Sequence, residues 1–532
     1  MKSAMTRLYS RGLLWVAVTG TLAVNATAQG QTSMKLDPSN MSKLGTVDPR
    51  YVSYNIDTVA VIGGRAWKPY KSSVGGQETE KPKAPADPNE QVGVNPSLYQ
   101  NRPSIDLSNL RLQKLAKALG PAYLRVSGTF RNSTYFQNND NPALQQAPEG
   151  FNGVLTRAEW KGVVDFSRAV DAPIVSSVAI SPGTRDADGV WNPTQAKEFF
   201  DYTKSLGGTI AATEFMNEPN FAIVGGAPKG YDASGFARDA KIFEVFLRKE
   251  SPDTIFLGPG SVGEGISLVP PGSKMKLIGS EDIMKATGPI FDAFSYHFYG
   301  GVSHRCLGTL TVDQALSAEW LNRTDTAEAF YAALRDKYLP GKPLWITETG
   351  EAACGGDEFA GQFVDSFRFL NQLGSLAQKN VKVILHQTLV GSDYGLLNEE
   401  TLEPTPDYWA ALLWKRLMGT VVLDPGTPKD QSLRIYAHCM KGKKGGVSVL
   451  ALNTDTEHEQ VLSLPQPAER FTLTAPDLTS NKVLLNGTEL QPESDGSIGS
   501  LKAAHASPEA IHLEPSSVTF LIIPLAHNQS CM

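Results

Sequence analysis

The sequence predicts an α/β fold: a (β/α)8 TIM barrel followed by a C-terminal all-β sandwich. Between residues 51 and 419, short apolar runs alternate with amphipathic helical patterns, as in a parallel sheet covered by helices. After Gly419 the pattern changes to short strands separated by Gly, Pro, Asn and Asp, which is typical of a sandwich. The chain has 532 residues, more than one hydrophobic core usually contains. We expect a signal peptide at 1–28, an N-terminal segment at 29–50 able to add a strand to the sandwich, the barrel at 51–419 and the sandwich at 420–532.

Eight runs qualify as barrel strands. They span residues 51–59, 122–126, 173–180, 209–216, 254–258, 291–298, 343–347 and 381–387. Helical patterns lie between them at 107–119, 157–170, 234–250 and 358–378, of which the last is the longest. Eight strand–helix units favour a closed barrel. An open doubly wound sheet is the alternative, but no Gly-rich phosphate loop follows the first strand.

The N-terminal 28 residues have the pattern of a cleaved signal peptide. Basic residues precede an apolar run at 13–24, and Ala26-Thr27-Ala28 is a small-residue cleavage site. A membrane anchor is the alternative, but the run is shorter than the roughly 18–20 residues that span a bilayer. We therefore expect a secreted or periplasmic protein that does not insert into a membrane.

The charge of the chain argues against nucleic acid as a partner. The formal net charge is −6, and loss of the targeting segment, with its three positive charges and no negative ones, changes it to −9. No global field then attracts nucleic acid or a polyanion, so local groups have to hold any acidic ligand. The eight histidines are scattered, and no CxxC or HExxH pattern is present. We therefore expect no metal and no other cofactor.

The chain contains four cysteines, Cys306, Cys354, Cys439 and Cys531. An even number in an exported chain permits two disulfides. Four cysteines allow three pairings, and the residues alone do not choose among them.

Two glutamates follow expected strands on opposite sides of the barrel mouth. Asn217-Glu218-Pro219 follows the fourth strand, and Glu348-Thr349-Gly350 follows the seventh. Since the carboxyl ends of barrel strands converge on one face, these carboxylates can flank one glycosidic bond. At a separation of about 5–5.5 Å, one attacks the anomeric carbon and the other protonates the leaving oxygen. This predicts a retaining glycoside hydrolase with Glu218 as acid/base and Glu348 as nucleophile.

Neighbouring residues offer alternatives and support. Glu214 lies four residues before Glu218, inside the expected strand and on the same face, so it can be a buried structural group. Glu351 competes with Glu348 but lies three residues further, in the expected loop. Asn217, next to the acid, is placed to bind the sugar 2-hydroxyl. Two surface carboxylates at loop starts remain the alternative reading of the pair.

Several segments resemble glycoside hydrolase family 79, the heparanase and β-glucuronidase family. The most specific is 386–423, which includes HQTLVGSDYG; the others are 121–129, 215–220, 296–300, 345–356 and the stretch from 433 to Cys531. The resemblance covers nearly the whole chain after the signal. It implies retaining cleavage of β-linked glucuronic acid by Glu218 and Glu348.

The resemblance also implies substrate contacts. Gly355 and Gly356 match a diglycine whose backbone N–H groups bind the uronic carboxylate, and such donors can cradle an anion; a plain turn is the alternative. Further contacts with the sugar are implied for Asp57, Thr129, Asn217, Gln387 and Tyr394. His297 and Tyr299 end the sixth strand near the nucleophile. Rim packing is the alternative for both tyrosines, and an indirect supporting role is the alternative for His297. Arg125 on the second strand is expected to support a catalytic carboxylate.

The cysteines mark one departure from the family. Heparanases carry a Tyr just before the diglycine, where this chain has Cys354. Cys306 and Cys354 follow the sixth and seventh strands on the same side, and we expect a disulfide between them that fixes these loops. Cys439 and Cys531 match the sandwich disulfide that the resemblance implies.

We expect an exo-β-glucuronidase acting on carbohydrates that contain a uronic acid. The exo preference rests on the acidity of the chain and on long loops at 63–104, 221–233 and 301–312. An endo-β-glucuronidase of the heparanase or hyaluronidase type is the alternative. A non-catalytic heparanase-like protein that binds glycans, and a barrel glycosidase acting on neutral sugars, stay open. The sequence does not indicate the aglycone or the oligomeric state.

Overall fold

The computed structural model describes residues 34–70, 95–222, 224–268 and 277–532. These described residues all belong to one compact unit. The expected signal peptide lies outside the described residues.

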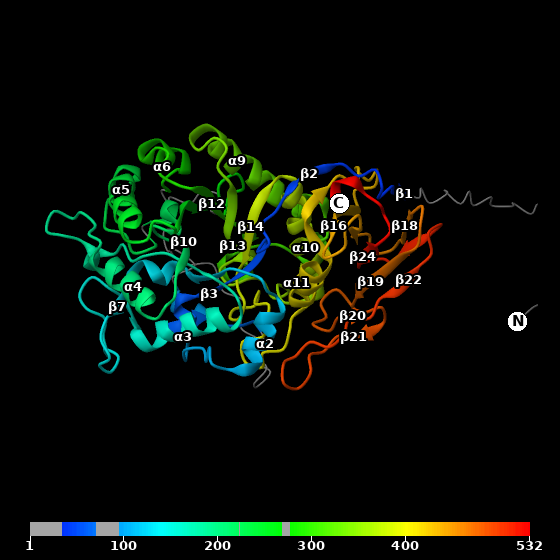
Figure 1. Cartoon of the computed structure of the whole chain (residues 1–532). Helices are drawn as coiled ribbons and strands as arrows, with labels where there is room; N and C mark the ends of the chain where they lie inside the picture. Colours follow the sequence, from blue (N-terminus) through cyan, green and yellow to red (C-terminus); the bar gives the residue numbers. More distant parts are fainter. Residues whose placement is uncertain (1–33, 71–94, 223, 269–276) are drawn as a thin grey trace, which may run out of the picture. The chain divides into compact units, whose positions relative to one another are not determined.

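Eight parallel strands close into a barrel, and they follow one another around it in chain order (Figure 1). They are β3 (Val52–Asp57), β6 (Leu124–Ser127), β9 (Ile174–Ser176), β10 (Ile210–Glu214), β11 (Ile255–Val262), β12 (Ala293–Val302), β13 (Leu344–Ala353) and β14 (Val381–His386). Each strand overlaps one of the eight expected runs, so the predicted barrel is confirmed. The open doubly wound sheet is excluded because β9 pairs with β10 and β14 pairs with β3.

Strands β11, β12 and β13 run further than their apolar patterns. The β12–β13 pairing continues to Val302 and Ala353, six residues past the expected end of the seventh strand. These ends contain Gly, Pro, Ser, Glu and Thr among their residues, so they do not continue the apolar pattern. As a consequence Glu348 lies within β13, directly opposite His297 of β12.

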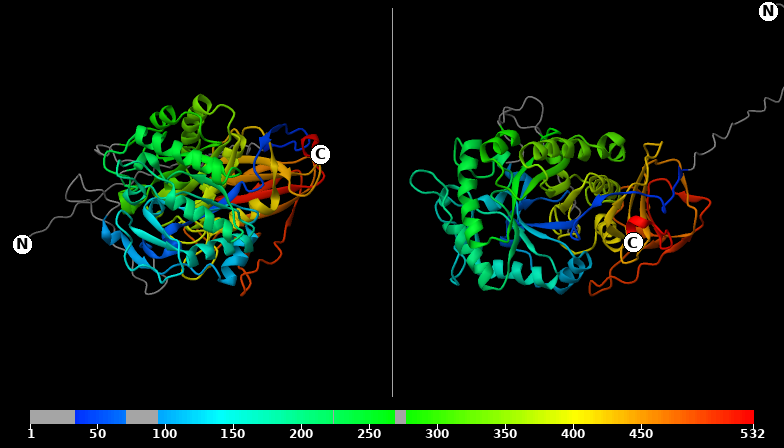
Figure 2. Two further views of the ribbon diagram at one scale, coloured as in Figure 1. Left: turned by 60° about the vertical axis from the view of Figure 1, so that its left-hand side comes forward. Right: turned by 45° about the horizontal axis from the view of Figure 1, so that its top comes forward.

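Helices surround the barrel, as Figure 2 shows from two sides. They are α1 (Thr58–Ile62), α2 (Leu110–Ala118), α3 (Arg157–Ala169), α4 (Thr194–Ser205), α5 (Ala233–Glu250), α6 (Ser280–Thr287), α7 (Val312–Ala315), α8 (Ala318–Leu321), α9 (Arg323–Tyr338), α10 (Phe363–Gln378) and α11 (Pro406–Leu417). Helix α3 shows why the amphipathic patterns fold in this way. A capping box of Thr156 and Glu159 begins it, and Trp160, Val163 and Phe166 bury one face at helical spacing.

Helix α10 begins later than its pattern predicts. The expected helical run starts at 358, but residues 358–362 form turns, with the amide of Gln362 donating to the carbonyl of Phe359. Gly361 packs against the carbonyl oxygen of Asp393 so closely that a Cβ there would lie 2.8 Å from it. The longest helix among the described residues is therefore α5, with 18 residues.

The C-terminal part contains two packed sheets. The larger follows the order β2 (Lys43–Thr46), β15 (Met418–Leu423), β16 (Leu433–Met440), β17 (Val447–Asn453), β24 (Ser517–Ile523), β19 (Ala468–Thr474), β20 (Leu484–Leu485) and β21 (Thr488–Glu489), with β22 (Ala504–Ala506) beside β19. The smaller has the order β1 (Met34–Lys35), β18 (Gln460–Ser463) and β23 (Ile511–Leu513). One face of the larger sheet, with Val449 and Leu521, packs on the smaller sheet. The opposite face, with Leu450 and Phe520, joins the barrel core.

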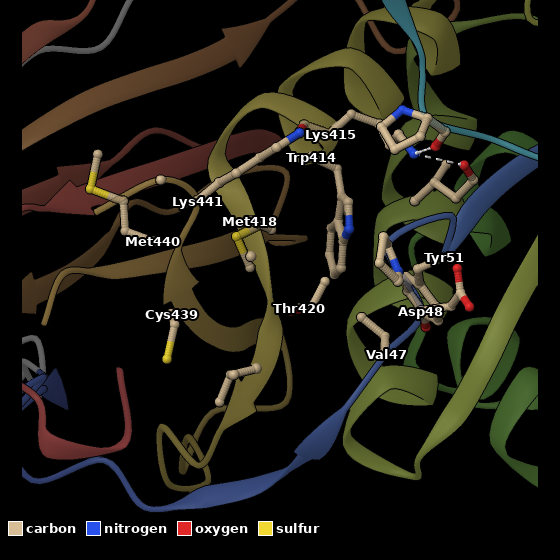
Figure 3. Close-up of a pocket in the computed structure, with 16 residues that line it drawn as sticks. Val47, Asp48, Tyr51, Trp414, Lys415, Met418, Thr420, Cys439, Met440 and Lys441 are labelled. Atoms are coloured by element: carbon tan, nitrogen blue, oxygen red, sulfur yellow. Dashed lines mark hydrogen bonds between the residues drawn. The ribbon is translucent and has the colours of Figure 1, made fainter. Parts of the chain in front are cut away.

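A cavity of about 280 Å³ lies where the barrel meets the larger sheet. Tyr51, Trp414 and Met418 line it (Figure 3). The Lys415 Nζ donates to the Val52 carbonyl at 3.2 Å and also to the Pro121 carbonyl. Tyr51, Val52 and Pro121 lie at the N-terminal ends of β3 and β6, opposite to the end that carries Glu348. The cavity therefore belongs to the domain junction.

Among the described residues, no helix combines the length and apolar character needed to cross a membrane.

Candidate active site

The two predicted carboxylates meet at the mouth of the barrel. Glu218 follows β10 in a left-handed backbone conformation, with φ 49° and ψ 63°, and Glu348 lies in β13. One carboxylate oxygen of each and one ring nitrogen of His297 lie within 4.8 Å of one another. The side chain of Glu218 is 19% exposed and that of Glu348 is 7% exposed. The pair is thus mostly removed from water but still accessible.

The surroundings of Glu348 favour its ionised form. Tyr299 donates its hydroxyl to Oε1 at 2.6 Å, and Arg125 donates to Oε2 at 2.8 Å. Burial alone would raise the pKa of Glu348, but the nearby His297 and Arg125 charges and these hydrogen bonds outweigh it and lower the pKa. A carboxylate held in this way is available as a nucleophile.

The surroundings of Glu218 favour its protonated form. Burial raises the pKa of Glu218, and the negative charge of Glu348 raises it further, while the hydrogen bond from His297 opposes both. The His297 Nδ1 lies 3.1 Å from the Glu218 carboxylate. Burial lowers the pKa of His297, but the three surrounding carboxylates outweigh this and raise it to about 9. The two glutamates therefore have pKa values shifted in opposite directions, as an acid and a nucleophile need.

A buried ionic layer lies beneath the pair. The guanidinium of Arg125 is fully buried and donates to Glu214 at 2.9 Å, to Asn217 at 2.8 Å and to Glu348. Glu214 is equally buried. It accepts two further hydrogen bonds, from the hydroxyls of Ser295 and Thr347. Arg125 thus fixes both the strand end that carries Asn217 and the Glu348 carboxylate, while Glu214 is a structural partner of the arginine.

Glu351 faces away from the barrel interior. Its Oε2 accepts the backbone N–H of Asp357 at 2.9 Å. Burial, together with the charges of Asp357 and Asp365, raises its pKa well above the usual range. Because Asp365 belongs to α10, Glu351 lies on the helix side of β13, and only Glu348 reaches the mouth.

The remaining predicted polar residues lie at different depths. Gln387 donates to Asp57 at 2.8 Å and accepts from Asn55 at 2.9 Å. Burial, followed by the negative charge of Glu348, raises the pKa of Asp57 to about 7. The ring of Tyr394 lies 6.3 Å from that of Tyr299, centroid to centroid. Thr129 is exposed, at the start of a 3-10 helix (Thr129–Ser133) beside Asp57.

The diglycine forms a tight loop after β13. Gly355 and Gly356 have φ values of 84° and 83°. Residues other than glycine rarely adopt this backbone conformation. A Cβ at Gly355 would lie 2.7 Å from the Trp67 ring, and one at Gly356 would lie 2.9 Å from Tyr394. The Gly356 N–H already donates to the Ala352 carbonyl at 3.1 Å. Two backbone N–H groups were expected to bind the uronic carboxylate, and that of Gly356 is already paired within the protein.

Both expected disulfides are present. Cys306 is bonded to Cys354, which joins the loops after β12 and β13, and Cys439 is bonded to Cys531 in the sandwich.

Sequence reasoning missed several residues that build the site. Asn132 exchanges two hydrogen bonds with the backbone of Asn217, at 2.8 and 2.9 Å. Arg305, which is buried, and Asp393, which is partly buried, form an ion pair that contacts the diglycine backbone. Nothing in the local pattern separates these polar residues from ordinary loop residues, because their partners are distant in sequence.

Glu218, His297 and Glu348 offer three possible metal ligands within reach of one another. However, both oxygens of Glu348 already accept hydrogen bonds, from Tyr299 and Arg125. The positive charge of Arg125, whose Nη1 lies 2.8 Å from Glu348 Oε2, also disfavours the binding of a metal cation at Glu348. The arrangement fits acid–base and nucleophilic chemistry better than a metal centre.

Comparisons with known proteins agree with the geometry. The model of the glycosyl hydrolase family 79 N-terminal domain matches residues 99–374, just over half of the chain. Heparanase-like protein 1 of Arabidopsis thaliana is 27% identical, covering 81% of this chain and 87% of the relative. The hyaluronoglucuronidase of Hirudo nipponia is 27% identical, with 80% and 92% covered. The baicalin-β-D-glucuronidase of Scutellaria baicalensis is also 27% identical, with 79% and 84% covered.

A solved structure supports the fold. The 4-O-α-L-rhamnosyl-β-D-glucuronidase from Fusarium oxysporum has a TM-score of 0.59 at 14% identity, covering 93% of this chain and all of that chain. The family model and the barrel with its paired carboxylates together show that this chain belongs to glycosyl hydrolase family 79.

Proposed function

We propose that the protein is a retaining exo-β-glucuronidase, with Glu348 as nucleophile and Glu218 as acid/base. The observation that carries the proposal is the carboxylate pair. Its closest oxygens lie within 4.8 Å. Retaining enzymes place their carboxyl groups about 5–5.5 Å apart, whereas inverting enzymes need about 6.5–9.5 Å to admit a water.

In the first step, an oxygen of Glu348 attacks the anomeric carbon, and the bond to the leaving oxygen breaks. The Glu218 proton passes to that oxygen, and a covalent glycosyl-enzyme forms. Esterification removes the charge of Glu348, which is one cause of the raised Glu218 pKa, so Glu218 then becomes the better base. In the second step, Glu218 takes a proton from water, the water oxygen attacks the same carbon, and Glu348 leaves.

Neighbouring residues support these steps. Arg125 and Tyr299 orient Glu348 and keep it ionised. Asn217, held by Arg125 and Asn132, is proposed to bind the 2-hydroxyl. Asp57, Thr129, Gln387 and Tyr394 are proposed to contact the remaining polar groups of the sugar.

Glucuronic acid is the proposed glycone. Two of the similar proteins carry glucuronidase activity in their names, and the diglycine loop supplies a backbone donor for a carboxylate. The exo preference is supported by a hairpin of the first loop, β4 (Gly64–Trp67) and β5 (Tyr99–Arg102). Its Trp67 packs against Gly355, so this pair of strands lies beside the loop that is proposed to bind the carboxylate. Two disulfides support an exported protein.

The test is to supply a chromogenic β-glucuronide, a hyaluronan oligosaccharide and a heparan sulfate oligosaccharide, and to size the products. Release of monomeric uronic acid supports the proposal, and internal fragments would identify the endo alternative. Absence of turnover on all three, with the protein folded, would contradict both and favour a glycan-binding role.

A further inference from the structure

The loop Cys354–Asp357 contains three peptide units whose hydrogen bonds can be followed one by one. Each unit is trans, so its C=O and N–H point in opposite directions. In the second unit, the Gly356 N–H donates to Ala352 and the Gly355 carbonyl accepts from the amide of Asp393. In the third, the Asp357 N–H donates to Glu351 and the Gly356 carbonyl accepts from Arg305.

The first unit is different. Its carbonyl, that of Cys354, accepts from the Ser303 hydroxyl at 3.2 Å and from Arg305 at 3.3 Å. Its N–H, that of Gly355, has no acceptor among the described residues. Because the carbonyl is held on the Arg305 side, this N–H points to the other side. The loop therefore presents one backbone donor.

We propose that Arg305 is a positioning residue for the carboxylate of the glycone: it fixes the Cys354–Gly355 peptide so that the Gly355 N–H is the single backbone donor. This inference rests on the proposed function. It differs from a two-donor diglycine, because the Gly356 N–H is used by Ala352.

The contacts of Arg305 suit this role. Its side chain is 3% exposed. Nη1 bridges the Cys354 and Gly356 carbonyls, while Nη2 donates to the Lys68 carbonyl at 2.7 Å and to Asp393. Asp393 neutralises the guanidinium, so its effect on a bound carboxylate comes from orienting the peptide and much less from its charge.

Two neighbours hold the loop on either side. The bond between Cys306 and Cys354 ties the residue next to Arg305 to the residue whose carbonyl Arg305 holds. The Trp67 ring packs on Gly355, where a Cβ would lie 2.7 Å from it. Only glycine fits at this position, because any larger side chain would overlap the Trp67 ring.

The experiment compares 4-nitrophenyl β-D-glucuronide with 4-nitrophenyl β-D-glucoside for the wild type, Arg305→Lys and Arg305→Gln. Lysine keeps the charge but has one nitrogen, so it cannot hold the Cys354 and Gly356 carbonyls with one nitrogen and Lys68 and Asp393 with another, as Arg305 does. A hydrogen bond to a charged group is strong enough for its misalignment to raise the glucuronide KM on the order of 10- to 100-fold. The glucoside has no carboxylate, so its kcat/KM should change less than about threefold. Inhibition constants for D-glucuronate and D-glucose give the same comparison without turnover.

Arg185→Lys is the matched control. Arg185 is also a buried arginine, 4% exposed and paired with Asp239 at 2.7 Å, but it has no contact with the loop. The Arg185→Lys variant should have a lower melting temperature and an unchanged glucuronide-to-glucoside ratio.

An unchanged glucuronide-to-glucoside ratio in folded Arg305 variants would overturn the inference. If these variants do not fold, Asp393→Asn decides, because it removes the carboxylate charge that holds Arg305 Nη2 and keeps the arginine itself: a lower glucuronide-to-glucoside ratio supports the inference, and an unchanged or higher ratio overturns it. A wild type without preference for the glucuronide would instead refute the proposed function.

Discussion

Replacing Tyr299 by Phe removes the hydroxyl that donates to the nucleophile and that also interacts with Tyr394. The hydroxyl lies 2.6 Å from Glu348 Oε1, and the residue is 5% exposed. A hydrogen bond to a charged group contributes about 1.5–3 kcal/mol, and one pKa unit corresponds to about 1.4 kcal/mol. Since this bond stabilises the ionised form of Glu348, its loss raises the pKa of that group. The acidic limb of the kcat/KM profile should move to higher pH by about one to two pH units.

The assay is the pH dependence of kcat/KM on a chromogenic glucuronide, which reports the ionisations of the free enzyme. Tyr296→Phe is the control: Tyr296 lies on the same strand, is fully buried, and its hydroxyl has no partner among the described residues. This control should leave the acidic limb in place. An acidic limb that does not move in Tyr299→Phe would refute the assignment of that limb to Glu348.

Three further predictions concern other parts of the molecule. Glu218→Gln should lower kcat about 10²- to 10⁴-fold, and azide, which needs no general base, should restore turnover of an activated glucuronide; no rescue would argue against the acid/base role. Cys306→Ser with Cys354→Ser opens a loop of 48 residues and should cost about 2–4 kcal/mol of stability, measured by denaturant unfolding, and raise the glucuronide KM. Burial lowers the pKa of Lys415 to about 7, so the folded state binds fewer protons than the unfolded state between about pH 7 and 10. Its contribution to stability therefore rises with pH in that window, by up to about 1.4 kcal/mol per pH unit, and the stability curve of Lys415→Met should be flatter there.

The barrel was predictable because its strands are short, apolar and bounded by helical patterns. Glu218 and Glu348 could be found for the same reason, since barrel strand ends converge on one face. The strand boundaries could not be predicted. Strand β13 continues to Ala353 because Thr349, Gly350, Ala352 and Ala353 pair with β12, and these partners lie about 50 residues away in the sequence.

The hydrogen bonds of the diglycine loop could not be predicted from the sequence. A Gly-Gly pair indicates backbone freedom, but it does not say which N–H is already paired. That depends on Ala352 at the end of β13, on Arg305 after β12 and on Asp393 after β14. Likewise, Glu351 looked like a competitor of Glu348, and only the position of α10 shows that it faces the helices.

The central claim is that Glu348 becomes covalently glycosylated. The most direct test is to react the protein with a 2-deoxy-2-fluoro-β-glucuronide that carries a good leaving group, and to measure intact mass followed by peptide mapping. The fluorine slows both steps and the leaving group speeds the first, so the intermediate accumulates. We predict one sugar per chain, attached to Glu348. Attachment to Asp57 or Glu351, or turnover of a natural glucuronide that first releases the α-anomer, would contradict the account.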